Sequence, residues 1–100
     1  MSADETRRYV VAYDVSSDPR RVRIAHTLQS YGDRVQYSVF LVDAKPSRML
    51  RLQARLAALL DHATDSVLIC DLGPRDAVGR SRMATIGAER TYTGAGPLIL

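Results

Sequence analysis

The chain has 100 residues, the size of one domain, and its apolar content of 46% argues against intrinsic disorder. No apolar run is long enough to cross a bilayer, and residues 1–6 are polar without a signal-peptide core. We therefore expect a cytoplasmic protein with no membrane partner. The single cysteine, Cys70, excludes a disulfide framework and a thiolate metal cluster, and its apolar neighbours predict a buried structural thiol.

The net charge is +3, and the basic residues are unevenly distributed along the chain. Thirteen of the fourteen are arginine, and residues 20–55 hold eight basic side chains against two acidic ones. Because the guanidinium fork matches phosphate, this segment predicts contact with a nucleic-acid backbone. A solvated, arginine-rich surface is the alternative that charge alone leaves open.

A strand is predicted over residues 8–15, where β-branched and aromatic residues precede Asp14. Alternation places four apolar side chains on one of its faces: Tyr9, Val11, Tyr13 and Val15. The other face carries Val10, Ala12 and Asp14, so we expect helices to cover one face and a second sheet to cover the other. Since burying an unpaired carboxylate is costly, Asp14 requires a cation, a basic side chain or water at the strand end.

A helix is predicted over residues 19–31, with Asp18 as its N-cap and Pro19 at its first position. Its apolar stripe at helical spacing consists of Val22, Ile24, Ala25, Leu28 and Tyr31. The first turns carry Arg20, Arg21 and Arg23, where the helix dipole favours acidic residues. Since these arginines do not stabilise the helix, we interpret them as phosphate-facing.

Residues 34–44 have the composition of a strand, but the segment is long for a single strand. It therefore predicts two strand segments joined by a tight bend, or one strongly bent strand. A second helix follows over about 47–61, and a last strand over 66–72 ends at Gly73 and Pro74. The apolar face of the second helix consists of Met49, Leu52, Leu56, Leu59 and Leu60. Another face carries Arg48, Arg51 and Arg55, which is either a solvated row or a stripe that contacts a duplex.

The order βαββαβ predicts an α+β, ferredoxin-like sandwich over residues 1–78, a fold that does not decide the function. Residues 79–100 are interpreted as an extension with one short strand candidate at 83–87. Its apolar end, 97–100, predicts docking on a second subunit or on a partner.

Three segments together resemble a known family: Tyr13-Asp14-Val15, then Asp18-x-x-Arg21-x-Arg23, then Asp33-Arg34-Val35-Gln36-Tyr37-Ser38-Val39-Phe40. A strand that ends in aspartate, a helix that bears arginines and the R-V-Q-Y-S-V-F string are similar to the small CRISPR-associated endoribonuclease family. The resemblance covers about residues 8–73, and the chain after Arg75 matches no motif of the family.

This resemblance implies a ferredoxin-like protomer and a homodimer in which two sheets pack face to face. It also implies a metal-dependent endonuclease of single-stranded RNA, double-stranded DNA or both. The enzyme would act in CRISPR adaptation, where new spacers are acquired, beside the CRISPR integrase as a partner. Asp14 of each subunit would bind Mg²⁺, with Mn²⁺ as a substitute, and the metal would activate water without a protein nucleophile.

The family's activity-supporting positions fall here on Tyr13, Arg21, Arg23, Arg34 and Phe40, beside Asp14. The arginines would bind phosphate, and the two rings would orient the site, stack a base or simply pack in an interface. The predicted nucleic-acid contacts are Arg20, Arg21, Arg23, Arg34, Arg48, Arg51 and Arg55.

Three other functions remain open at this point. The first is a non-catalytic scaffold that bridges integrase dimers, with duplex DNA on its arginine surface and a structural Asp14. The second is a toxin-like messenger ribonuclease with the same fold. The third is a small-molecule sensor, although the chain has no glycine loop to cradle a ligand.

Overall fold

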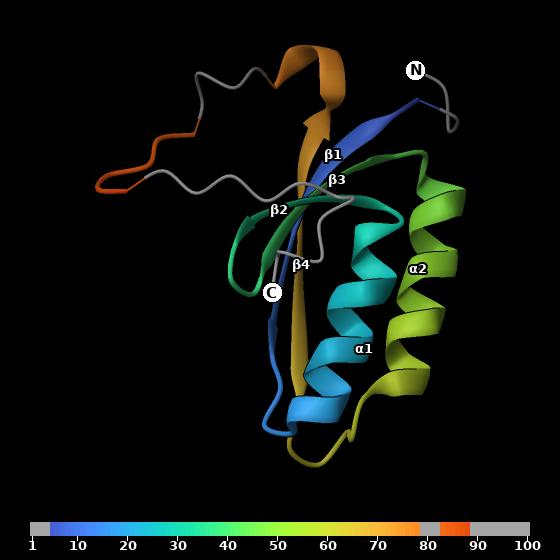
Figure 1. Cartoon of the computed structure of the whole chain (residues 1–100). Coiled ribbons are helices and arrows are strands. Elements are labelled where there is room, and N and C mark those ends of the chain that lie inside the picture. Colours follow the sequence, from blue (N-terminus) through green and yellow to red (C-terminus); the bar gives the residue numbers. More distant parts are fainter. Residues whose placement is uncertain (1–4, 79–82, 89–100) are drawn as a thin grey trace.

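The computed structural model describes residues 5–78 and 83–88, which form one α+β domain (Figure 1). The elements follow the predicted order: β1 (Arg7–Asp14), α1 (Asp18–Gln29), β2 (Gly32–Gln36), β3 (Val39–Ala44), α2 (Pro46–Leu59), β4 (Ser66–Pro74) and a 3₁₀ turn, η1 (Arg75–Ala77). Among the described residues, no helix has the length and apolar character needed to span a membrane. The predicted ferredoxin-like order βαββαβ is confirmed.

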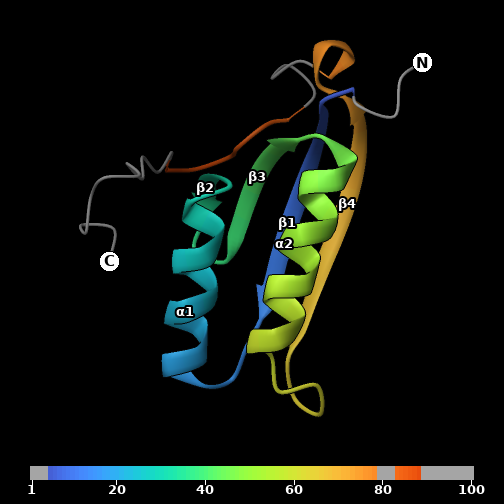
Figure 2. The same cartoon turned by 90° about the vertical axis from the view of Figure 1, so that its right-hand side faces the viewer.

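The four strands form one sheet in the order β2-β3-β1-β4, so β1 is a central strand. Every pair of neighbours is antiparallel, and β1 aligns Val11 with Phe40 of β3 and with Ile69 of β4. Figure 2 shows α1 and α2 side by side against one face of the sheet. The two helices therefore leave the opposite face of β1 uncovered, and we call that side the open face.

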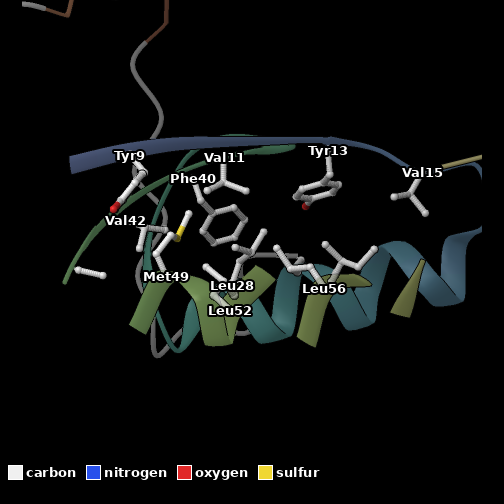
Figure 3. Packing of buried hydrophobic residues seen from close by; sticks show 13 residues of the cluster. Tyr9, Val11, Tyr13, Val15, Leu28, Phe40, Val42, Met49, Leu52 and Leu56 are labelled. Carbon is white, nitrogen blue, oxygen red and sulfur yellow. The ribbon is translucent and has the colours of Figure 1, made fainter. Parts of the chain in front are cut away.

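The core lies between the helices and the covered face of the sheet (Figure 3). The predicted alternation in β1 is confirmed, since all four odd-numbered apolar residues from 9 to 15 are buried. They pack against buried side chains of the other elements: Ile24, Ala25, Leu28, Phe40, Val42, Met49, Leu52 and Leu56. Burial of each large apolar side chain contributes roughly 1.5–3 kcal/mol, so these contacts fix the position of β1 within the sheet.

The open face carries small and apolar residues in register across β1 and β4. Val10 pairs with Cys70, Ala12 pairs with Leu68, and Asp14 pairs with Ser66. Leu68 is 62% exposed, and Cys70 is exposed as well. The expectation of a buried Cys70 is therefore wrong for the single chain, because its apolar neighbours belong to a face that the helices do not cover.

Several local predictions need correction. The N-cap of α1 is Ser17, whose hydroxyl accepts a hydrogen bond from the Arg20 amide, and Asp18 is instead the first helical residue. Val22 is 66% exposed, because its place on α1 lies outside the arc shared by Ile24, Ala25 and Leu28.

The chain from 34 to 44 is two strands separated by a turn at Tyr37 and Ser38, as one of the two interpretations predicted. The described residues 83–88 contain no strand, so the candidate at 83–87 is wrong. The predicted docking segment, 97–100, lies outside the described residues.

Candidate functional site around Asp14

Asp14 is the last residue of β1 and is exposed to solvent on the open face. The residues on either side of it, Tyr13 and Val15, are buried in the core, so the strand is anchored immediately before and after the carboxylate. Among the described residues, no group of three or more His, Cys, Asp or Glu side chains is placed to hold a metal ion. The described part of a single chain therefore supplies the Asp14 carboxylate here but not a site with three or more protein ligands.

Tyr13, Arg34 and Phe40 form a connected group on the covered side of the same strand end. The Tyr13 hydroxyl donates to the Tyr37 carbonyl oxygen at 3.3 Å and accepts from Arg34 Nη2 at 3.1 Å. The Arg34 guanidinium carbon lies 5.3 Å from the ring centroid of Phe40 and 5.6 Å from that of Tyr37. Cation–π contacts and the Tyr13 hydroxyl thus fix this guanidinium beside β1.

The rings of Tyr13 and Phe40 pack against each other with centroids 6.3 Å apart. Phe40 has no exposed surface, and Tyr13 is only 6% exposed. A buried ring cannot stack on a base, so of the roles expected for Phe40 the geometry supports packing. Tyr13, which is also buried, contacts Arg34 through its hydroxyl.

Arg21 lies on the first turn of α1 and contacts the segment that follows Asp14. Its Nη1 donates to the Val15 carbonyl oxygen at 2.7 Å, and its Nη2 pairs with the Asp18 carboxylate. Arg23 is exposed on the same helix. The structure therefore places Arg21 beside the strand end through a backbone contact, whereas Arg23 is exposed on α1.

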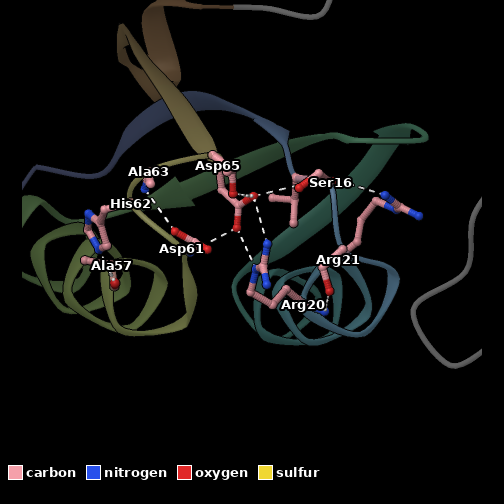
Figure 4. Close-up of polar contacts among 11 residues, drawn as sticks. Ser16, Arg20, Arg21, Ala57, Asp61, His62, Ala63 and Asp65 are labelled. Atoms are coloured by element: carbon pink, nitrogen blue, oxygen red, sulfur yellow. Dashed lines mark hydrogen bonds and ion pairs between the residues drawn. The ribbon is translucent and has the colours of Figure 1, made fainter.

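The carboxylate of Asp65, at the turn before β4, joins three segments near the strand end (Figure 4). Its side chain is fully buried, and Arg20 donates to both oxygens, from Nε at 2.7 Å and from Nη2 at 3.2 Å. The amides of Ser16 and Asp61 donate at 3.3 and 3.0 Å, and the Thr64 hydroxyl donates at 3.1 Å. We call the Arg20–Asp65 ion pair with these donors the Asp65 clamp.

The sequence indicates only a turn at Asp65 and does not reveal the clamp. Arg20 and Asp65 are 45 residues apart, and no local pattern connects residues at that separation. The clamp also changes the interpretation of Arg20, since its Nε and Nη2 already donate to a carboxylate. The predicted contact of Arg20 with phosphate is therefore not supported by this geometry.

The Asp65 carboxylate is stabilised in its charged form. The hydrogen bonds from Arg20 are the largest influence, and with those from the backbone amides they lower the pKa of Asp65 well below its ordinary value, against the opposing effect of burial. A folded-state pKa below the unfolded one adds stability at pH values above the unfolded pKa, about 3.9. That contribution disappears as the pH falls from there toward the folded-state value.

We therefore expect Asp65→Asn to lower the melting temperature at pH 7, because the amide loses the ion pair with Arg20. A change of this kind shifts the melting temperature of a domain this size by about 4–8 °C per kcal/mol. The difference between wild type and variant should shrink as the pH falls from about 5 to 2, because Asp65 of the unfolded chain takes up a proton there while the folded chain keeps the carboxylate charged. Thermal unfolding across pH measures it, and a difference that does not vary with pH would contradict this account.

The arginine row belongs to α2, which lies in the helix layer (Figure 2). Asp14, by the alternation of β1, is on the open face. The Arg48 guanidinium carbon lies 4.3 Å from the ring centroid of Tyr31, and Arg48 Nη2 donates to the Ser30 carbonyl oxygen at 3.2 Å. Arg55 approaches the same ring at 5.9 Å, and Arg51 is exposed. The predicted nucleic-acid residues therefore come from three elements, α1, β2 and α2.

Comparisons with known proteins agree with this fold. The family model described as CRISPR associated protein Cas2 matches residues 7–78. A curated relative from Rhodospirillum rubrum, named CRISPR-associated endoribonuclease Cas2 3, is 44% identical over 96 residues, which is 91% of this chain and 98% of the relative. The CRISPR-associated endoribonuclease Cas2 of Nitratidesulfovibrio vulgaris is 38% identical over the full length of both chains.

Solved structures give the same result. A hypothetical protein from Thermus thermophilus superposes with a TM-score of 0.73 at 35% identity, over 86% of this chain and 96% of that one. Cas2 of Streptococcus pyogenes, solved at pH 6.5, superposes with a TM-score of 0.70 at 30% identity, over 80% and 99% of the two chains. The matched region contains β1, Arg21, Arg34 and the whole sheet, so the chain belongs to the CRISPR-associated Cas2 family.

Proposed function

We propose that this protein is a metal-dependent phosphodiester endonuclease that acts on single-stranded RNA, double-stranded DNA or both, in the acquisition of CRISPR spacers. The observation that carries the proposal is an exposed carboxylate, Asp14, at the end of a central strand whose neighbouring residues are buried. Arg21 and Arg34 are held near that strand end by the contacts described above. The names of the curated relatives, which are endoribonucleases or endonucleases, support the same reaction class.

The metal would be shared between two copies of the chain. Mg²⁺ is usually bound by one or two carboxylates and keeps several waters. Two subunits would supply two Asp14 carboxylates to one ion, whereas a single chain supplies one. Once bound, Mg²⁺ or Mn²⁺ would polarise a phosphodiester oxygen and lower the pKa of a coordinated water. The protein's part is to hold the two carboxylates on rigid strands.

The open face is the surface through which we propose that the homodimer forms. Val10, Ala12, Leu68 and Cys70 give β1 and β4 a small, apolar surface there, and Asp14 lies at its edge. Burial of this surface against a second copy would cover Leu68 and Cys70 and bring the two Asp14 residues to one site. This arrangement would provide the second sheet that the sequence leads us to expect over β1.

The arginines would act on the phosphate backbone. Arg34 is held by Tyr13 and flanked by Phe40, and a guanidinium fixed in this way can offset charge that develops on a phosphate without further ordering. Arg23 is exposed and would bind a more distant phosphate. Tyr13 and Phe40 would contribute through Arg34 and not through contact with substrate.

A non-catalytic scaffold is the second function that an observation favours. Arg51 and the neighbouring Arg48 and Arg55 lie on the helix layer, away from the Asp14 face, where a duplex would bind without reaching the carboxylate. In this alternative the dimer bridges copies of the CRISPR integrase. Residues 79–100 would contact the integrase or the second subunit.

The test is a cleavage assay of the purified protein on single-stranded RNA and duplex DNA, with Mg²⁺, Mn²⁺ or EDTA. We expect cleavage that requires the metal and stops with EDTA, and the more reactive substrate identifies the preferred nucleic acid. Duplex binding without cleavage under any condition would contradict the nuclease and favour the scaffold.

A further inference from the structure

The Asp65 clamp contacts the chain next to the candidate metal ligand, and its central carboxylate is fully buried, so Asp65 itself cannot touch a metal or a substrate. The buried carboxylate binds the Ser16 amide, two residues after Asp14. Asp65 also immediately precedes Ser66, the residue that pairs with Asp14 across the β1–β4 register. One side chain therefore fixes both the chain that leaves Asp14 and the neighbouring strand beside it.

The clamp also ties the first turn of α1 to the turn before β4. Arg20 lies in the first turn of this helix, and its donors reach across to the α2–β4 turn (Figure 4). In the next position, Arg21 donates to the Val15 carbonyl oxygen. Two consecutive arginines thus hold the three-residue connection between β1 and α1, one through Asp65 and one through the backbone.

The charges of the clamp balance each other. The Arg20 guanidinium and the Asp65 carboxylate form a bidentate pair, so the buried carboxylate places little net negative charge behind Asp14. Without Arg20, the uncompensated Asp65 charge would oppose the approach of a second carboxylate and disturb the turn. The pair therefore holds the turn after Asp14 in place and also neutralises the buried charge of Asp65.

We infer that Arg20 and Asp65 are positioning residues that hold the Asp14 carboxylate for metal binding, and that Arg20 acts through Asp65 and not by contact with nucleic acid. This inference rests on the proposed nuclease. Partners that orient a metal ligand typically change metal affinity or activity by about 10–100-fold when they are removed. Positioning by the clamp should have an effect in this range, although neither residue touches the metal or the substrate.

The experiment compares Asp65→Asn and Arg20→Gln with wild type. It measures the Mn²⁺ concentration at half-saturation by electron paramagnetic resonance, and kcat and KM on single-stranded RNA. Both variants should raise the half-saturating Mn²⁺ concentration and lower kcat by about tenfold each, with KM changed by no more than about twofold. Amide hydrogen exchange at residues 15–17 should be faster in both.

Asp71→Asn is the matched control, because Asp71 accepts from Arg7 at 2.9 and 3.1 Å at the far end of β1. This variant loses a more exposed Arg–Asp pair at a distance from Asp14 and should keep wild-type Mn²⁺ binding and kinetics. If Asp65→Asn does not fold, Thr64→Val provides a milder test, since it removes one donor to the Asp65 carboxylate.

The outcomes separate the inference from the proposed function. Wild-type Mn²⁺ binding in Asp65→Asn, despite faster exchange at residues 15–17, would overturn the positioning role. An increase in KM for Arg20→Gln that Asp65→Asn does not share would show that Arg20 contacts the nucleic acid directly. If wild type does not cleave, the proposed nuclease fails, while the Mn²⁺ comparison still decides the inference. A wild type that binds no Mn²⁺ overturns both.

Discussion

Replacing Asp14 by asparagine should abolish most metal-dependent cleavage while leaving the fold intact. The side chain is exposed at the end of β1, so its replacement removes no packing. In the proposed dimer, one substitution removes both carboxylates of the shared site. We expect cleavage to fall by about two to three orders of magnitude, the loss found when a group that stabilises transition-state charge is removed.

The measurement is the initial rate of RNA and DNA cleavage with Mg²⁺ or Mn²⁺, together with a thermal melt. Arg7→Gln serves as a control, because Arg7 lies at the opposite end of the same strand. It should lower stability slightly and leave the rate unchanged. Cleavage at the wild-type rate by Asp14→Asn would place the reaction at another site.

The substitution Leu68→Asp should convert the protein to a monomer and abolish activity with it. Leu68 is 62% exposed in the single chain and pairs with Ala12 on the open face, so the dimer would bury two copies of the new carboxylate. Burial of unpaired charge costs several kcal/mol per ion. Each 1.4 kcal/mol is tenfold in affinity, so we expect the dimer Kd to rise by roughly a thousandfold or more.

Leu50→Asp provides a closely matched control. Leu50 is 65% exposed, carries the same side chain, and lies on α2 in the helix layer. It should remain dimeric and active. Sedimentation at micromolar concentration distinguishes the two variants, and a Leu68→Asp protein that remains a dimer would exclude the open face as the interface.

The sequence predicts the fold well because its main signals are local. The alternation of residues 9–15 and the leucine spacing of the second helix indicate their elements without knowledge of the rest of the chain. The predicted end of the last strand at residues 73–74 is less accurate, because β4 continues through Pro74. Asp14 is predicted for the same reason, since a carboxylate that ends an apolar strand is visible in a few consecutive residues. Its exposure agrees with one of the three environments expected for it, water at the strand end.

The contacts around Asp14 are not predictable in this way. Arg20 looks like its neighbours Arg21 and Arg23 in the sequence, yet it alone of the three donates to Asp65 among the described contacts. Phe40 belongs to a family motif, yet its burial shows that it supports Arg34 by packing. Both facts depend on which segments meet in space, and that is determined by the sheet order and not by local composition.

Because both helices cover the same face of the sheet, the two faces of β1 should tolerate different substitutions. Along this strand, odd-numbered positions from 9 to 13 meet the core, while even-numbered positions face the open side. A survey of all single substitutions should therefore show two interleaved tolerance profiles with a period of two residues. Polar replacements at odd positions would reduce the amount of folded protein, and those at even positions would leave folded protein that no longer self-associates. The two faces of this eight-residue strand are therefore constrained separately, one by folding and the other by self-association.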